Sequence, residues 1–214
     1  MRVVLVAAKQ LALAKSRLAP ALPSNLERAT LAEAMFRDVL AAALSARLAD
    51  RVAVVTSDIR LIGYARAAGT LVVDEEFPRG LNVAVRIATT ALRDAGATTI
   101  CTVLSDIPLT TGADIDTALT VDPAAQVVLI PSRDCSGTNM IVRTPPDVIA
   151  TQFGRLSLVR HREDCRERAI SCQVVRISRP ALDLDLPADL IEFARTPTMT
   201  HTFRNLDRLG LLHG

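Results

Sequence analysis

The segment "RVVLVAAKQLALAKSRLAP", residues 2–20, joins a short apolar run to a loop that carries positive charge. Residues 2–7 are continuously apolar after the first arginine, which is typical of a central β-strand covered on both faces. Lys9 and Lys15 in the following loop are two of the chain's 25 basic residues, and the other 23 are arginines. The segment predicts a buried first strand whose carboxyl end leads into a lysine-bearing loop.

Six more apolar, β-rich runs follow the first one, and helical patterns separate the early runs. The runs are residues 51–56, 70–74, 99–106, 126–132, 138–143 and 172–178, and the helical patterns cover residues 25–48, 58–70 and 80–98. Such alternation predicts an α/β fold with a mostly parallel central sheet and helices on both faces. The two strands around residues 132–137 predict a small hairpin-type insertion. Without a repeat or a linker, we expect one domain, residues 1–214.

Bulk composition excludes several classes of function. The net charge is +2, which gives no reason to expect a nucleic acid or a membrane as partner. The longest uncharged run, residues 95–105, is far shorter than the roughly 18–20 residues that a bilayer span needs. Four cysteines without C-x-x-C spacing and three histidines without ligand spacing favour free thiols over a zinc site. We therefore expect a cytoplasmic protein.

Ligands of such sheets bind beyond the carboxyl ends of the strands. The loop after the first strand contains neither G-x-G-x-x-G nor a Walker-type glycine loop. It offers instead the small-residue turn Ala7–Ala8, followed by Lys9, Lys15 and Arg17. Backbone N–H groups and mobile ammonium groups suit phosphates, although an ordinary solvated basic face is the alternative interpretation.

Two carboxylates stand at comparable places elsewhere in the chain. Asp106 directly follows an apolar run, and Asp185 precedes a helix that begins with proline. One or two carboxylates plus phosphate oxygens are the usual ligands of Mg²⁺. The alternatives are structural, since Asp106 suits the start of a turn and Asp185 suits the N-cap of a helix.

Two further segments carry polar groups that suit an anionic ligand. "CSGTN", residues 135–139, is a glycine-containing loop with hydroxyl and amide groups. In "FGRLSLVRH", residues 153–161, Ser157 and His161 are four residues apart and would share one face of a helix. A turn glycine, a capping serine and a surface histidine would explain this second pattern equally well.

These motifs together resemble the guanylyltransferases of coenzyme F420 biosynthesis (CofC/FbiD type), a family with a Rossmann-like nucleotidyltransferase fold similar to that of molybdenum-cofactor guanylyltransferases. The resemblance covers most of the chain. It rests on six stretches in the expected order, "KQLALAKSRLA" (9–19), "RGLNVAV" (79–85), "LSDIPLT" (104–110), "RDCSGTNM" (133–140), "FGRLSLVRH" (153–161) and "LDLDLPADL" (182–190). Residues 197–214 match no motif of the family.

The resemblance implies transfer of GMP from GTP to a phosphorylated three-carbon acid, with Mg²⁺ as cofactor and pyrophosphate as product. It implies that Asp106 and Asp185 bind the metal and act with Lys15 in catalysis. It implies nucleotide contacts from one set of residues and acid contacts from another: Ala7, Ala8, Lys9, Lys15, Gly80, Leu81 and Asn82 for the nucleotide, and Thr138, Gly154 and Ser157 for the acid. Family members also make a homodimer plausible.

Several alternatives stay open at this point. Another nucleotidyltransferase, of the molybdenum-cofactor or isoprenoid-precursor type, would share these features. Asp183 and Asp185 satisfy the D-x-D signature of nucleotide-sugar glycosyltransferases, although that motif is expected nearer the middle of a chain. A non-catalytic nucleotide-binding regulator is a third alternative. Among 2-phospho-L-lactate, phosphoenolpyruvate and 3-phospho-D-glycerate, the arginine-rich composition favours the last two, and we expect 3-phospho-D-glycerate.

Overall fold

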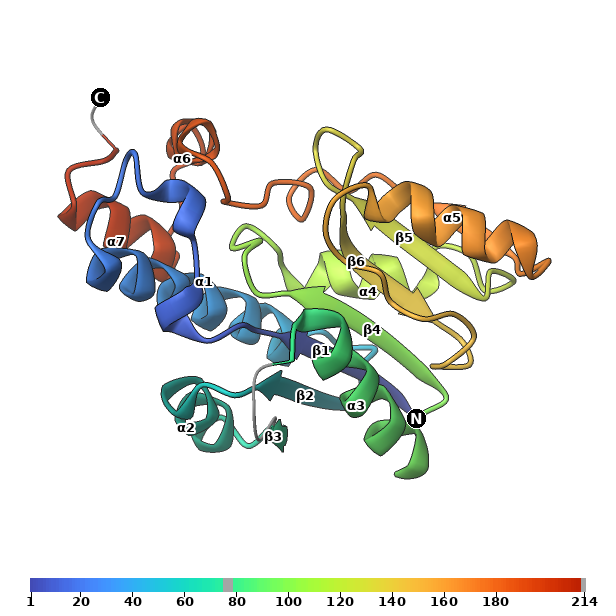
Figure 1. Ribbon diagram of the computed structural model, residues 1–214. Helices are drawn as coiled ribbons and strands as arrows, with labels where there is room; N and C mark the ends of the chain where they lie inside the picture. Colours follow the sequence, from blue (N-terminus) through green and yellow to red (C-terminus); the bar gives the residue numbers. More distant parts are fainter. Residues whose placement is uncertain (75–78, 213–214) are drawn as a thin grey trace.

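A computed structural model describes residues 1–74 and 79–212 of the chain, and its centre is one seven-stranded β-sheet (Figure 1). The strand order is β3-β2-β1-β4-β6-β5-β7, and every strand except β6 runs parallel to the others. The bounds are β1 Arg2–Ala7, β2 Arg51–Thr56, β3 Leu71–Asp74, β4 Thr99–Leu104, β5 Val127–Pro131, β6 Thr138–Arg143 and β7 Cys172–Val174. The predicted α/β fold with a mostly parallel sheet is confirmed.

The predicted hairpin exists, but its strands belong to the central sheet. Strands β5 and β6 pair antiparallel, and β6 also pairs with β4, so that Met140 lies between Val103 and Ile130. Because β6 runs against its neighbours, its first residue lies at the edge where the parallel strands end. This reversal brings Thr138 and the loop of residues 132–137 to the carboxyl edge of the sheet.

Helices cover both faces of the sheet, as predicted. They are α1 Asn25–Ser45, α2 Ile59–Ala67, α3 Leu81–Asp94, α4 Gly112–Thr120, α5 Ser157–Glu167, α6 Pro187–Ala194 and α7 His201–Arg208. Helices α3 and α5 pack on one face, in front of the sheet in Figure 1, and the remaining helices contribute to the core on the other face. Two 3₁₀ turns, Leu11–Leu13 and Ser16–Leu18, shape the loop after β1.

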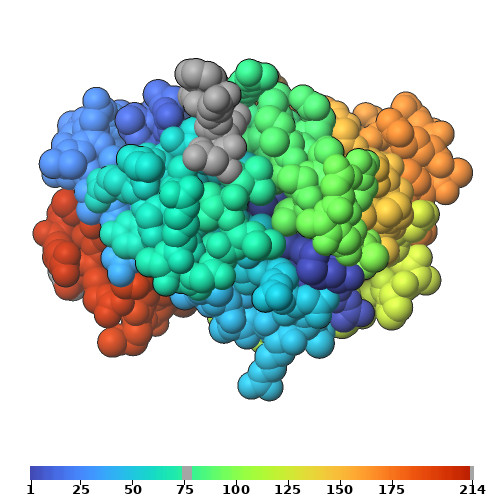
Figure 2. Space-filling model, turned by 90° about the horizontal axis from the view of Figure 1, so that it is seen from below, coloured from blue at the N-terminus to red at the C-terminus, as the bar shows by residue number. Residues whose placement is uncertain are grey.

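The core explains why the first apolar run is continuous. Val3 and Leu5 face α3 and α5, whereas Val4 and Val6 face the opposite layer, and all four side chains are fully buried. Seen from below, residues of α2, β3 and α3 fill the middle of the molecule and leave only a narrow dark-blue band of the first residues visible between them (Figure 2). A strand covered in this way has no polar face, and its sequence shows none.

The C-terminal segment, which matches no motif, packs on the helical layer through α7. The carboxylate of Asp38 in α1 accepts hydrogen bonds from the backbone N–H groups of His201 and Thr202, at 2.7 and 2.8 Å. A carboxylate at a helix N-terminus satisfies free N–H groups and interacts favourably with the helix dipole. Within the described residues, every helix is too short or too polar to cross a membrane.

Candidate active site

A cavity of about 740 Å³ opens at the carboxyl edge of the sheet. Its walls come from the loop after β1, the segments after β4 and β5, the loop before α5 and the segment before α6. Most of the predicted site residues line this cavity, namely Ala7, Lys9, Lys15, Leu81, Asp106, Thr138, Gly154, Ser157 and Asp185. Ala8, Gly80 and Asn82 are not among its lining residues.

Lys15 connects the two predicted metal ligands. Its Nζ donates a hydrogen bond to Asp106 Oδ2 at 2.8 Å and to Asp185 Oδ1 at 2.7 Å. The side chain of Lys15 is only 6% exposed, whereas that of Asp185 is 39% exposed. The three residues are far apart in the sequence, so the folded sheet edge alone brings these charges together.

Local backbone structure holds the three charged groups in place. Lys15 lies between the two 3₁₀ turns with φ of 56°, in the left-handed region that non-glycine residues rarely adopt. The N–H of Leu184 donates to the carbonyl of Asp106 at 3.0 Å and joins the segments that carry the two aspartates. The N–H of Leu11 donates to Asp58, the N-cap of α2, which fixes the start of the lysine-bearing loop.

Of the structural alternatives, Asp106 does lie in a turn after β4, but Asp185 is not the N-cap of α6, which is Leu186. The carboxylate of Asp189 performs the capping at α6, because its Oδ2 accepts from the N–H groups of Leu186 and Asp185 at 2.7 and 3.1 Å. The side chain of Asp185 is therefore free to contact Lys15. Asp106 likewise pairs with Lys15, and its Oδ1 is buried without a hydrogen-bond partner.

The charges of the cluster stabilise one another. Burial alone would lower the pKa of Lys15, but the attraction of Asp106 and Asp185 outweighs it, and the pKa is raised. Burial would raise the pKa of Asp185, but the ammonium of Lys15, with Arg17 and Lys9, holds that pKa below its usual value. Lys15 is therefore charged and Asp185 ionised at neutral pH.

Asp183, the first aspartate of the D-x-D pattern, differs from Asp185. Burial, followed by repulsion from Asp106, raises the pKa of Asp183 to about 6. Its Oδ1 accepts a hydrogen bond from Asn139 Nδ2 at 3.2 Å. The two aspartates of the pattern therefore have different partners and different acidities.

The residues present fit a divalent cation. Asp106 Oδ1 is a buried oxygen without a donor, and an unsatisfied carboxylate oxygen in such a place is costly unless a cation approaches it. Lys15 compensates only one of the two charges on Asp106 and Asp185. Mg²⁺ takes one or two carboxylates and completes its shell with phosphate and water, so Asp106 and Asp185 are sufficient protein ligands for it.

The second half of the cavity is built from hydroxyl groups. The N–H of Thr138 donates to Ser157 Oγ at 2.8 Å, and Thr138 Oγ1 lies 3.1 Å from His161 Nδ1. His161 is fully buried and comes from the same helix face as Ser157, as their spacing predicts. Gly154, with φ of 116°, forms the turn before α5, a conformation in which a side chain would be strained.

The loop of residues 132–137 is held by Asp134. The carboxylate of Asp134 accepts hydrogen bonds from the hydroxyl groups of Ser132 and Ser136, at 2.6 and 2.7 Å, and from the N–H of Ser136. Ser132 Oγ in turn accepts from the N–H of Gly137 at 2.8 Å. The polar groups of this loop thus bond mainly to one another and fix its shape beside Thr138.

Three of the residues predicted to contact the nucleotide also have a place in the local structure around the cavity. The amide of Asn82 exchanges two hydrogen bonds with the backbone of Phe153, at 2.7 and 3.0 Å. The N–H of Ala8 donates to the carbonyl of Val55, and Gly80 is the N-cap of α3 with φ of 95°. Asn82 therefore positions the loop before α5, which forms the cavity wall.

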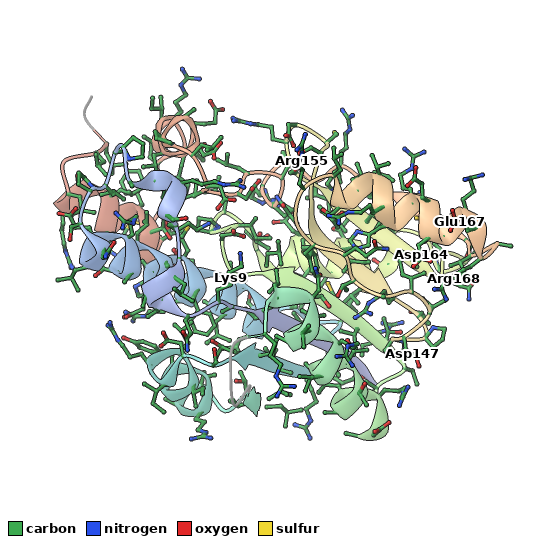
Figure 3. The ribbon with its side chains drawn as sticks, in the orientation of Figure 1. Lys9, Asp147, Arg155, Asp164, Glu167 and Arg168 are labelled. Atoms are coloured by element: carbon green, nitrogen blue, oxygen red, sulfur yellow. The ribbon has the colours of Figure 1, made fainter. Side chains whose placement is uncertain are left out.

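Charge of both signs surrounds the cavity, and part of it was not foreseen from the sequence. Lys9 extends from the loop after β1 towards the middle of the molecule, and Arg155 lies across from it on the loop before α5 (Figure 3). The charged lining residues include Lys9, Lys15, Arg17, Arg133, Arg155, Asp106, Asp134, Asp183, Asp185 and Asp189. Such a mixture suits a polyanion bound with a cation better than an anion alone. Of the unforeseen residues, Asp189 had a readable signal, because it stands at the third position of a helix that begins with proline.

Comparisons with known proteins show the family of the chain. Residues 1–212 match the family model described as "Guanylyl transferase CofC like". The chain is 40% identical over 200 residues to a 3-phospho-D-glycerate guanylyltransferase of Phenylobacterium zucineum, covering 92% of this chain and 91% of the relative. It is 34% identical over 192 residues to a phosphoenolpyruvate guanylyltransferase of Sphaerobacter thermophilus, covering 90% and 92%.

A solved structure with the same fold is a putative nucleotide-diphospho-sugar transferase from Desulfovibrio desulfuricans G20. Its TM-score is 0.77 at 19% identity, and the match covers 99% of this chain and 96% of that chain. This likeness concerns the fold, whereas the family follows from the model match and from the relatives described above. The chain belongs to the CofC-like guanylyl transferase family.

Proposed function

We propose that this protein transfers GMP from GTP to a phosphorylated three-carbon acid and releases pyrophosphate, as a step of coenzyme F420 biosynthesis. The observation that carries the proposal is the contact of Lys15 with Asp106 and Asp185 in the cavity of a CofC-like chain. A reaction between two polyanions needs positive charge beside the phosphates and carboxylates that bind a divalent cation, and this cluster offers both.

The proposed reaction joins two phosphate groups and requires no protein nucleophile. An oxygen of the acid's phosphate attacks the α-phosphorus of GTP, the new P–O bond forms, and the bond from that phosphorus to the bridging oxygen of the β-phosphate breaks. The attacking oxygen is already ionised at neutral pH, because the second pKa of a phosphomonoester is about 6. The electron pair of the broken bond leaves on pyrophosphate. No general base is needed, because the attacking oxygen carries no proton.

Each part of the cavity has a role in this proposal. Asp106 and Asp185 would hold Mg²⁺, which supplies Lewis-acid neutralisation of phosphate charge when bound. Lys15 and Lys9 place positive charge where triphosphate oxygens would lie. Thr138 and Ser157 provide hydroxyl groups for the acid at the other side of the cavity.

The acid that we propose is 3-phospho-D-glycerate. The relative from Phenylobacterium zucineum carries that substrate in its name and is 40% identical to this chain. Phosphoenolpyruvate is the second candidate, since the relative from Sphaerobacter thermophilus is named for it. We also propose that the enzyme acts as a cytoplasmic homodimer, which light scattering of the purified protein would test.

One assay tests the proposed reaction. Purified protein with Mg²⁺ is offered each of four nucleoside triphosphates with each of the three acids, and pyrophosphate release is measured. We expect pyrophosphate release with GTP and at least one acid, and little or no release when the acid is left out. Release with CTP but not GTP would assign the protein to another nucleotidyltransferase type, and no release with any pair would favour a non-catalytic regulator.

A further inference from the structure

His161 is a buried titratable residue that the proposed chemistry does not use. Its side chain is fully buried in α5, and its ring packs edge-on against Phe153. Both ring nitrogens have partners, because Gln152 N–H lies 2.8 Å from Nε2 and Thr138 Oγ1 lies 3.1 Å from Nδ1. The ring thus connects the cavity wall at Thr138 with the loop that precedes α5.

These two contacts determine which nitrogen carries the proton. A backbone N–H can only donate, so Nε2 of His161 accepts the hydrogen bond from Gln152 and has no proton. In a neutral ring the proton then lies on Nδ1, which donates to the hydroxyl oxygen of Thr138. Burial, with the charges of Arg143 and Arg160, lowers the pKa of His161 to about 4, so the ring is neutral at physiological pH.

The hydroxyl proton of Thr138 is consequently available to a ligand. Its oxygen already accepts from His161, so the O–H group is left to donate, and Thr138 is a buried residue of the cavity wall. Ser157 has the same property, because its oxygen accepts from the N–H of Thr138 at 2.8 Å. Two neighbouring hydroxyl donors match an ionised carboxylate, whose two oxygens only accept.

We infer that His161 is a positioning residue that makes the Thr138 hydroxyl a donor to the carboxylate of the acid substrate. The inference rests on the proposed function, since it concerns the same acid. It assigns the histidine at the end of the "FGRLSLVRH" segment to substrate recognition through Thr138. The histidine itself does not touch the substrate.

Two substitutions separate this role from a purely structural one. In His161→Asn the side-chain amide lies near the Nδ1 position, so it keeps a donor for Thr138 and loses the acceptor for Gln152. In His161→Gln the longer side chain brings its carbonyl near the Nε2 position, so it keeps the acceptor and loses the donor. If His161 only held the loop at Gln152, His161→Asn would be the more harmful change.

The experiment is steady-state kinetics of pyrophosphate release, with the KM for the acid and the KM for GTP measured separately. We expect His161→Gln to raise the acid KM by at least about tenfold, because the Thr138 hydroxyl loses the donor that orients it towards a charged carboxylate, and to leave the GTP KM within about twofold. His161→Asn should keep the acid KM within about threefold of the wild-type value.

A double-mutant cycle with Thr138→Val provides the second readout. Because His161 acts through the Thr138 hydroxyl, His161→Gln should have little further effect on the acid KM once that hydroxyl is gone. Additive effects, an unchanged acid KM in His161→Gln, or a larger effect of His161→Asn would each overturn the inference. Should His161→Gln fail to fold, a rise of more than about threefold in the acid KM of His161→Asn still overturns it. Absence of turnover in the wild-type enzyme would instead refute the proposed function and this inference with it.

Discussion

Acidification should destabilise this protein through His161, because the folded state excludes the proton that the unfolded state takes up. The groups that act on the ring are Arg143 and Arg160, which oppose a positive charge, and Asp164, which favours it but acts more weakly. Nε2 of His161 also accepts the N–H of Gln152, and a protonated ring would have to give up that contact. Unfolding frees the ring from all of these constraints.

The magnitude follows from the two pKa values. The pKa of His161 is about 4 in the folded state and 6.5 in the unfolded state. The unfolded state therefore binds more protons between these values, so the free energy of unfolding falls as the pH falls through that window. Linkage gives a loss of about 2 kcal/mol between pH 7 and pH 5, and about 3 kcal/mol in total below pH 4.

The assay has to isolate His161 from Asp183, which acts in the opposite direction. The pKa of Asp183 is raised to about 6, so its protonation stabilises the fold as the pH falls. Both the wild type and His161→Asn contain Asp183, so its contribution cancels in the difference between their free energies of unfolding, measured with urea at pH 7 and pH 5. The advantage of the wild type over the variant should shrink by about 2 kcal/mol at pH 5. A difference that is the same at both pH values would refute the reasoning about His161.

Three other predictions concern the charged cluster and its supports. We expect Lys15→Met to lose turnover but to bind Mg²⁺ more tightly in the absence of GTP, because no ammonium group then neutralises Asp106 and Asp185. Calorimetry that shows weaker Mg²⁺ binding would contradict this. Asp189→Ala should lower the free energy of unfolding by about 1 kcal/mol and should also lower turnover, because it removes the cap that holds the Asp185 segment. Asp189→Asn keeps an acceptor and should have smaller effects on unfolding and on turnover. Gly154→Ala should cost about 1–3 kcal/mol, because φ of 116° disfavours any side chain, and an unchanged unfolding midpoint would argue against that strain.

Local sequence patterns were sufficient to predict most of the fold. The seven apolar runs correspond to the seven strands, and the helices around residues 25–48, 58–70 and 80–98 form with shorter ends. The place of β6 inside the sheet could not be predicted, because strand order depends on pairing between remote segments. The same holds for α7, whose N-terminus is capped by Asp38 from 163 residues away.

The candidate site was predictable in part. The positions of Lys15 and Asp106 at the sheet edge follow from the rule that ligands bind beyond the ends of parallel strands, whereas Asp185 was predicted from its place before a helix and from the family resemblance. Their direct contact did not follow, because it depends on the left-handed turn at Lys15 and on the backbone bond between Leu184 and Asp106. The family resemblance places Asn82 among the nucleotide contacts, and only the fold shows that its amide also bonds to the backbone of Phe153.

The central claim is that GMP transfer occurs at the cluster of Lys15, Asp106 and Asp185. The most direct measurement is pyrophosphate release by Asp106→Asn with Mg²⁺, GTP and 3-phospho-D-glycerate, beside a urea unfolding curve of the same preparation. Since the substitution removes one charge and keeps the shape, we predict a loss of turnover of at least about 100-fold with an unfolding midpoint no lower than that of the wild type. Turnover close to the wild-type rate in the folded variant would contradict the claim.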